Sequence, residues 1–86
     1  MEIFVTSGFR RKFKKFSPEI KRRAKEKEKI FRNNPFDSRL ETHKLRGKYA
    51  SFWAFSVTNT YRAMFRFLGE KKAVFVDIDT HNIYRD

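Results

Sequence analysis

The chain has 86 residues, a formal net charge of +11 and no cysteine. A chain of this length buries about 60–65% of its unfolded surface, which gives one small core and no room for a deep cavity. The composition excludes a disulfide framework and a thiolate metal site, and no apolar run approaches the roughly 18 residues of a membrane span. We expect a single cytoplasmic domain over residues 1–86, with no signal peptide and no membrane partner.

The positive charge is concentrated in the first half of the chain. Residues 1–48 hold sixteen Lys or Arg against six Asp or Glu, whereas residues 49–86 hold five against four. Such asymmetry indicates an anionic partner: nucleic acid first, an acidic protein second, a membrane surface third. The alternative is a helical surface that lysine makes soluble.

The N-terminal part of the chain predicts a short strand followed by two helices. Residues 2–6 are rich in β-branched and aromatic side chains, which favour a strand, and Ser7 is a candidate N-cap for the next element. An apolar stripe recurs at helical spacing: Phe9, Phe13 and Phe16. Ser17-Pro18 is typical of the start of a second helix, which Asn33-Asn34-Pro35 ends.

The rest of the chain predicts an antiparallel meander. A short extended piece at 42–45 and a turn at 46–48 precede three strand-like segments with short connections: 52–57, 61–68 and 73–78. We therefore expect an α+β fold, in which two N-terminal helices pack on one face of a four- to five-stranded, mainly antiparallel sheet. The other face is expected to stay partly open.

Alternation along the segment 61–68 divides its side chains between the two faces of the sheet. Arg62 and Arg66 are expected on the open face, because the core set is Tyr61, Ala63, Phe65 and Phe67. Arginine is always charged and can bind a phosphate bidentately. The alternative is that both arginines are solubilising charges on a half-exposed strand.

Two histidines and a tyrosine are candidates for proton transfer. His81 follows the last predicted strand, and His43 lies in the extended piece before the meander. The ordinary pKa of histidine lies near neutrality, so either side chain can take or give a proton at cellular pH. Tyr84 can act as an acid, a stacking ring or a cap of the sheet edge. The alternative for both histidines is an ordinary surface position.

The sequence contains no pattern that predicts a metal or cofactor site. Asp77 and Asp79 are the only acidic pair at strand spacing around a predicted strand, and there is no His-x-x-x-His motif and no glycine-rich phosphate loop. A nuclease of this composition would be metal-independent. It would need a base for a ribose 2′-hydroxyl, a cation for the phosphate and an acid for the leaving oxygen. That chemistry works on RNA and not on DNA, which lacks the 2′-hydroxyl.

Four segments of the second half carry a resemblance to a known family. They are Lys44-Leu45-Arg46-Gly47, Phe52 to Val57, Tyr61 to Phe65, and the ending Asp77 to Arg85. Together with the preceding strand and two basic helices, they resemble the RelE/ParE superfamily of toxins from type II toxin–antitoxin systems. The resemblance implies an endoribonuclease that cleaves mRNA in the ribosomal A site, uses no cofactor and is inhibited by an acidic antitoxin protein.

The resemblance also implies roles for individual residues. Arg62 matches the family's phosphate-stabilising arginine, and Tyr84 is similar to its C-terminal tyrosine. His81 matches a tail position where relatives carry an arginine or a catalytic histidine, and His43 resembles a histidine that one branch uses. Further cations are expected to hold the backbone of mRNA or rRNA: Lys44, Arg46, Lys48, Arg66 and Arg85.

The chain departs from the family pattern at two positions. Ala54 and Ser56 stand where some relatives place two lysines that face the groove, which puts more weight on His81 and His43. This departure keeps open a ParE-like toxin, which inhibits DNA gyrase by protein binding and does not cleave RNA. A third interpretation is a non-toxic RNA-binding module or a decayed toxin.

Overall fold

The computed structural model describes residues 1–80 of the chain. Its elements follow in the order β1 Glu2–Val5, α1 Ser7–Lys14, α2 Pro18–Asn33, η1 Ser38–Leu40, β2 His43–Lys44, η2 Gly47–Tyr49, β3 Trp53–Ser56, β4 Tyr61–Gly69 and β5 Lys72–Thr80. The two η elements are short 3₁₀ helices.

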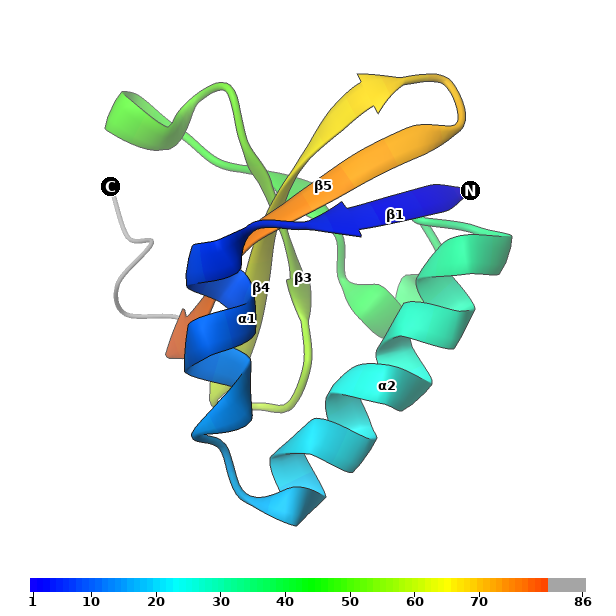
Figure 1. Ribbon diagram of the computed structural model, residues 1–86. Coiled ribbons are helices and arrows are strands. Elements are labelled where there is room, and N and C mark those ends of the chain that lie inside the picture. Colours follow the sequence, from blue (N-terminus) through cyan, green and yellow to red (C-terminus); the bar gives the residue numbers. More distant parts are fainter. Residues whose placement is uncertain (81–86) are drawn as a thin grey trace.

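All five strands belong to one sheet with the order β1-β5-β4-β3-β2 (Figure 1). The predicted antiparallel meander is formed by β3, β4 and β5, and β2 adds an antiparallel edge. β1 lies at the other edge and runs parallel to β5. The α+β fold expected from the sequence is confirmed, with a mixed sheet of five strands.

The two helices begin at side-chain caps. The predicted cap of α2 is confirmed, because Ser17 Oγ accepts a hydrogen bond from the Ile20 amide at 3.3 Å. The predicted cap of α1 is wrong by one residue. Thr6, not Ser7, accepts from the Phe9 amide at 3.1 Å, and the Thr6 hydroxyl also donates to the Val76 carbonyl of β5 at 3.3 Å. Thr6 therefore caps α1 and joins it to the sheet.

The main core lies between the helices and one face of the sheet. Phe31 of α2 is fully buried at its centre. Its ring centroid lies 4.9 Å from that of Phe65, 5.2 Å from that of Phe75 and 5.4 Å from that of Phe55. These rings belong to β4, β5 and β3, so a single helical residue contacts all three strands of the meander.

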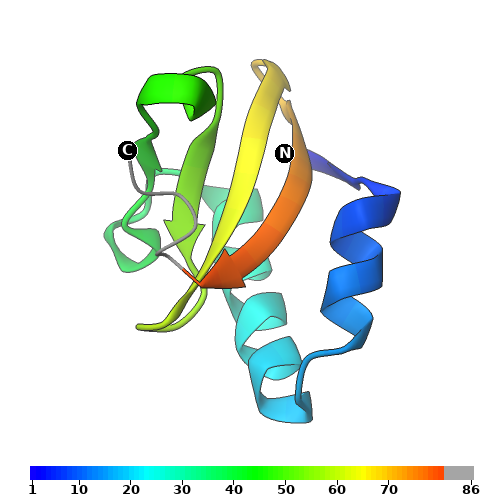
Figure 2. The ribbon, with the colours of Figure 1, turned by 90° about the vertical axis from the view of Figure 1, so that its left-hand side faces the viewer.

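A smaller apolar cluster covers part of the opposite face. It comprises Leu45, Ala54 and Met64, with Tyr49, Phe52 and Val76 packed against them. The segment 45–52 therefore folds over this part of the sheet. Figure 2 shows the sheet with α2 behind it and α1 beside β5, so neither helix covers the opposite face.

One irregularity in β5 decides which side chains reach that face. Phe65 pairs with Phe75, whereas the preceding Met64 pairs with Asp77, so Val76 is an extra residue in β5. Such a bulge breaks the alternation of side chains. Phe75 and Ile78 consequently both point into the main core, although they are three residues apart. Within residues 1–80, no helix has the length and apolarity to cross a membrane.

Candidate nucleic-acid interface

Arg62 lies in a row of three residues that face away from the helices. In the register of the sheet, Ser56 of β3 is directly opposite Arg62 of β4, which in turn is directly opposite Asp79 of β5. Directly opposite residues of antiparallel strands present their side chains on the same face. This is the face of Met64, two residues further along β4, and it lies outside the main core.

Backbone carbonyls hold the guanidinium of Arg62. Its Nη1 donates to the Thr58 carbonyl at 2.7 Å and to the Tyr61 carbonyl at 3.2 Å. The Ser56 hydroxyl donates to the same Thr58 carbonyl at 2.9 Å. These acceptors are neutral, and none of the ion pairs formed within residues 1–80 involves Arg62. Within residues 1–80 no carboxylate therefore pairs with this half-buried guanidinium, and a guanidinium has five N–H donors to share.

The turn that supplies these carbonyls is held by its own threonine. The amides of Val57 and Thr58 both donate to the Tyr61 carbonyl, at 2.9 and 3.2 Å. The amides of Thr60 and Tyr61 both donate to Thr58 Oγ1 at 3.1 Å. A threonine that bonds to backbone amides two and three residues ahead stabilises a tight turn. The Thr58 carbonyl therefore has a fixed position beside Arg62.

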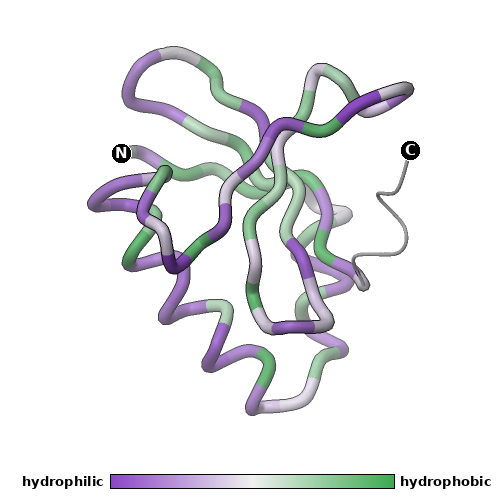
Figure 3. The backbone as a smooth tube through the Cα atoms, turned by 180° about the vertical axis from the view of Figure 1, so that it is seen from behind, coloured by the Kyte–Doolittle hydropathy of each residue, from purple (hydrophilic) through white to green (hydrophobic). Residues whose placement is uncertain are grey.

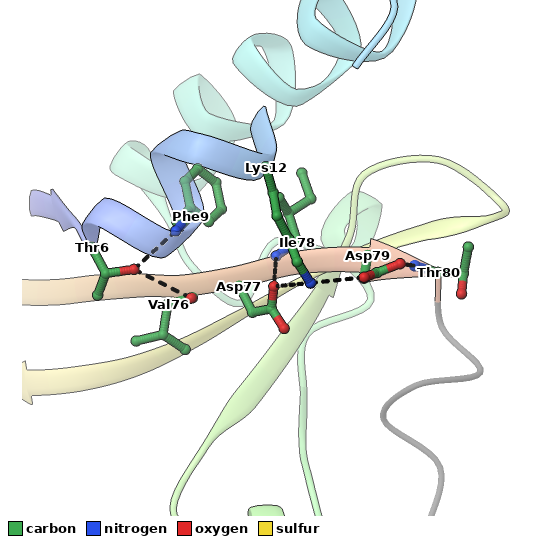
Figure 4. A network of polar contacts seen from close by, with 8 residues as sticks. All are labelled: Thr6, Phe9, Lys12, Val76, Asp77, Ile78, Asp79 and Thr80. Carbon is green, nitrogen blue, oxygen red and sulfur yellow. Dashed lines mark hydrogen bonds and ion pairs between the residues drawn. The ribbon is translucent and has the colours of Figure 1, made fainter. Parts of the chain in front are cut away.

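Lys12 of α1 binds both aspartates at the end of β5 (Figure 4). Its Nζ lies 2.8 Å from Asp77 Oδ1 and 2.8 Å from Asp79 Oδ2. The hydrogen bonds that Lys12 donates to Asp77 and Asp79 raise the pKa of Lys12, and the same bond to Asp79 lowers the pKa of that carboxyl. β1 pairs with β5 only as far as Phe75, and Lys12 reaches the part of β5 beyond that point.

Lys27 of α2 contacts the other side of the meander, at a part of β3 with which β2 does not pair, much as Lys12 contacts the end of β5. β2 pairs only with Trp53 and Ala54 of β3, and further along β3 the Lys27 Nζ donates to the Ser56 carbonyl at 3.3 Å. It also donates to the Arg39 carbonyl at 3.3 Å. Burial lowers the pKa of Lys27, and the positive charges of Arg23 and Arg62 contribute further. The charges of Lys27 and Arg62 therefore act on each other.

Lys12, Lys27 and Asp79 were not among the residues that the sequence singled out for the site. The alternation of β4 predicted the face of Arg62, but the charged groups near it come from α2, through Lys27, and from β5, through Asp79, which Lys12 of α1 binds. Asp77 and Asp79 were visible as a pair at strand spacing. Their contact with Lys12 depends on the bulge at Val76 and on the position of α1 along β5, which local sequence patterns do not fix.

The other predicted residues are divided between the two faces. His43 is exposed and directly opposite Ala54, so it shares the face of Arg62, and its Nδ1 lies 3.0 Å from the Glu41 carbonyl oxygen. The exposed Arg66 is directly opposite Val74, on the same face as Met64. Lys44 is opposite Trp53, whose side chain packs on the main core, so Lys44 lies at the edge of the helix-covered face.

The remaining predicted residues lie in η2 or in the C-terminal segment. Arg46 and Lys48 are exposed around η2, and the Lys48 ammonium lies 5.3 Å from the centroid of the Tyr49 ring. Three residues fall outside the described part of the chain: His81, Tyr84 and Arg85. β5 ends at Thr80, which is opposite Tyr61 and adjacent to the row of Arg62.

A groove lies on the helical side of the molecule, between α1, α2 and the sheet. Its volume is about 330 Å³. Its apolar lining consists of Val5, Phe9, Phe13, Ala24 and Phe75. Its charged lining consists of Arg10, Lys25, Lys29 and Glu28. Along α2, apolar positions are isolated among hydrophilic ones (Figure 3). The lining residues make the groove an apolar strip with a mainly cationic border.

The arrangement of helices and strands is shared with several solved toxin structures. The YoeB/ParE toxin from Agrobacterium tumefaciens superposes with a TM-score of 0.79 at 15% identity, over 94% of this chain and 99% of the other. YafQ from E. coli strain BL21(DE3) gives 0.77 at 16% identity, over 95% and 94%. The chain has the fold of the RelE/ParE toxins.

The same RelE-like fold occurs in the toxin–antitoxin complex RelBE2 from Mycobacterium tuberculosis. That structure gives a TM-score of 0.70 at 23% identity, over 93% of this chain and 96% of the other. No protein-family model and no curated protein sequence matches the chain. The RelE-like fold is therefore visible in the three-dimensional arrangement and not in overall sequence similarity.

Proposed function

We propose that this protein is the toxin of a toxin–antitoxin pair and acts as a metal-independent endoribonuclease on mRNA in the ribosomal A site. The observation that carries the proposal is the environment of the Arg62 side chain. On a RelE-like fold, its guanidinium lies half-buried on the face away from the helices and is bound only to neutral carbonyls in the described part of the chain. Such a group stabilises the charge that develops on a phosphate during cleavage.

The proposed reaction uses the ribose next to the cleaved bond. A base removes the proton of the 2′-hydroxyl, the 2′-oxygen forms a bond to phosphorus, and the bond to the 5′-oxygen breaks as an acid protonates it. The products are a 2′,3′-cyclic phosphate and a 5′-hydroxyl. Arg62 stabilises the phosphorane, and His81, Tyr84 and His43 are the proposed proton carriers.

RNA binding is assigned to Arg46, Lys48 and Arg66 around this face, to Lys44 at the adjoining edge of the sheet, and to Arg85 in the C-terminal segment. Contacts to phosphates make affinity depend on salt, with a slope of log K against log salt of about −0.7 per contact for single strands. We expect the Arg66→Ala variant to bind all RNA sequences more weakly and to reduce this slope by one contact.

Growth arrest provides the test of the toxin activity. We expect expression of the wild-type protein to stop growth, and the double variant Arg62→Ala/His81→Ala to lose this effect while it still folds and binds its antitoxin. The control is Arg22→Ala, because Arg22 is exposed on α2 and its ion pairs are with Glu19 and Glu26 of the same helix. Unchanged toxicity of the double variant would reject the catalytic roles.

The proposed partner is an acidic antitoxin whose amphipathic helix docks in the groove between α1 and α2. An apolar helix face fits the strip formed by Phe9, Phe13 and Ala24, and acidic residues beside it fit Lys25 and Lys29. The similar RelBE2 structure is itself a toxin–antitoxin complex. Co-expression with the neighbouring gene should yield a complex with a small acidic protein.

A ParE-like toxin that inhibits DNA gyrase is the second candidate. The observation that favours it is the face of β3 near Arg62, where Ala54 and Ser56 are 1% and 4% exposed and offer no lysine. Such a toxin needs no proton carriers. It predicts inhibition of gyrase supercoiling by the purified protein and intact transcripts in the expressing cells.

A further inference from the structure

The proposed RNA site around Arg62 contains two carboxylates, those of Asp77 and Asp79. Asp79 is directly opposite Arg62, and directly opposite residues have Cβ atoms about 4.5–5.5 Å apart. A guanidinium on such a residue can reach the carboxylate. In the structure it does not: the Asp79 Oδ2 binds Lys12 at 2.8 Å, and Arg62 donates to the carbonyls of Thr58 and Tyr61.

We infer that Lys12 is a positioning residue for Arg62. By holding Asp79 and Asp77, it keeps these carboxylates from pairing with Arg62 and leaves the guanidinium available for an RNA phosphate. This inference rests on the proposed function. Its physical basis is competition, because an arginine binds carboxylate and phosphate with the same planar set of donors.

The geometry around Lys12 is fixed from both sides. On the sheet, the Asp79 Oδ1 accepts from the Thr80 amide at 2.8 Å, and the Asp77 Oδ1 accepts from the Ile78 amide at 2.9 Å. On the helix, the Thr6 hydroxyl ties the first turn of α1 to the Val76 carbonyl (Figure 4). These hydrogen bonds therefore fix the position at which the Lys12 ammonium binds the two carboxylates of β5.

Removal of the charge of Lys12 gives the first test. In Lys12→Met, Asp79 is expected to pair with Arg62, and RNA cleavage should fall roughly 10–100-fold, the range for one hydrogen bond between charged groups. In Lys12→Met/Asp77→Asn/Asp79→Asn, activity should return to within about threefold of wild type, since no carboxylate remains to compete. Lys14→Met is the control, because it removes an exposed charge from the same helix.

The variant Asp79→Asn separates this role from a catalytic one. If Asp79 were the general base, the amide would abolish cleavage. Our inference predicts near wild-type cleavage by Asp79→Asn. Loss of activity in Asp79→Asn, or failure of the triple variant to recover while its unfolding temperature matches that of Lys12→Met, would overturn it.

A titration of Asp79 by NMR tests the same inference without RNA. The groups that face Asp79 are Lys12, Arg62 and Asp77. In Lys12→Met, the pKa of Asp79 should stay below its ordinary value, because Arg62 takes over, and it should rise in Lys12→Met/Arg62→Met. A pKa of Asp79 that rises to its ordinary value or above in Lys12→Met alone would overturn the inference. A wild-type protein that leaves RNA intact would reject the proposed function, and the titration would still decide the role of Lys12.

Discussion

Phe31 is the residue on which the packing of the main core converges. It is fully buried and its ring contacts Phe55, Phe65 and Phe75 from three strands. Truncation of a buried phenylalanine removes apolar contacts and leaves a cavity. We expect Phe31→Ala to lower the free energy of unfolding by about 3–5 kcal/mol in urea denaturation.

The matched control for this prediction is Phe4→Ala. Phe4 is 43% exposed in the edge strand β1, so its truncation should cost about 1 kcal/mol or less. Equal losses for the two variants would contradict the central place of Phe31.

Asp37 carries a pH-dependent contact of the 3₁₀ helix η1. Hydrogen bonds from the side chain and amide of Arg39, at 2.9 Å, lower the pKa of Asp37 from 3.8 to about 2. A depressed carboxyl pKa stabilises the folded state above pH 3.8, and this contribution is lost as the pH falls toward 2. In an NMR titration, we expect Arg39→Ala to raise the pKa of Asp37. The pair is exposed, so the unfolding temperature at pH 7 should change little.

The helix α1 depends on Thr6 at its start. Because Thr6 caps α1 and also binds the Val76 carbonyl, Thr6→Ala should lower the free energy of unfolding by about 1 kcal/mol, within a usual range of about 0.5–2. Ser7→Ala should be nearly neutral, because Ser7 already lies inside the helix. The two variants are compared by chemical denaturation, and a larger loss for Ser7→Ala would contradict the observed cap.

Much of the arrangement of elements was predictable, and the exceptions have tertiary causes. Phe9 and Phe13 at helical spacing and the Ser17-Pro18 pair identified both helices, because periodicity and capping are local properties. Phe16, predicted on the same helical stripe, lies beyond the end of α1 at Lys14. Adjacent Thr6 and Ser7 are both good caps, and the bond from Thr6 to Val76 favours the first. No local pattern reports such a bond.

The bulge in β5 shows the same limit of local patterns at the candidate site. With unbroken alternation from Phe75, the side chains of Asp77 and Asp79 would point into the apolar core. The extra residue Val76 turns both carboxylates to the other face, where Lys12 binds them. The sequence predicted that Arg62 lies on this face, and the residues that surround it required the three-dimensional structure.

The two proposed binding surfaces lie on different parts of the molecule. The RNA face is proposed around Arg62 on the sheet, whereas the antitoxin is proposed to occupy the groove between the helices. These surfaces should respond to different substitutions. We expect Lys25→Glu/Lys29→Glu to weaken antitoxin binding by more than tenfold in calorimetry, because it places like charges opposite an acidic partner.

RNA cleavage by the same double variant should stay close to wild type, since neither lysine lies on the face of Arg62. The control is Lys71→Glu/Lys72→Glu, which reverses the same charge away from the groove, at the turn residue before β5 and at the first residue of β5. Equal loss of antitoxin binding in both double variants would indicate a general charge effect and contradict the groove as the docking site.

Arg62 is proposed to stabilise the charge on a phosphate as an RNA strand is cut. The most direct measurement is the mapping of 5′-hydroxyl ends on mRNA from cells that express wild-type protein or Arg62→Ala at equal folded levels. We expect new ends within translated codons for the wild type and about 100–1,000-fold fewer for Arg62→Ala, the usual cost of losing one such donor. Intact transcripts with folded wild-type protein, or equal cleavage by both proteins, would contradict it.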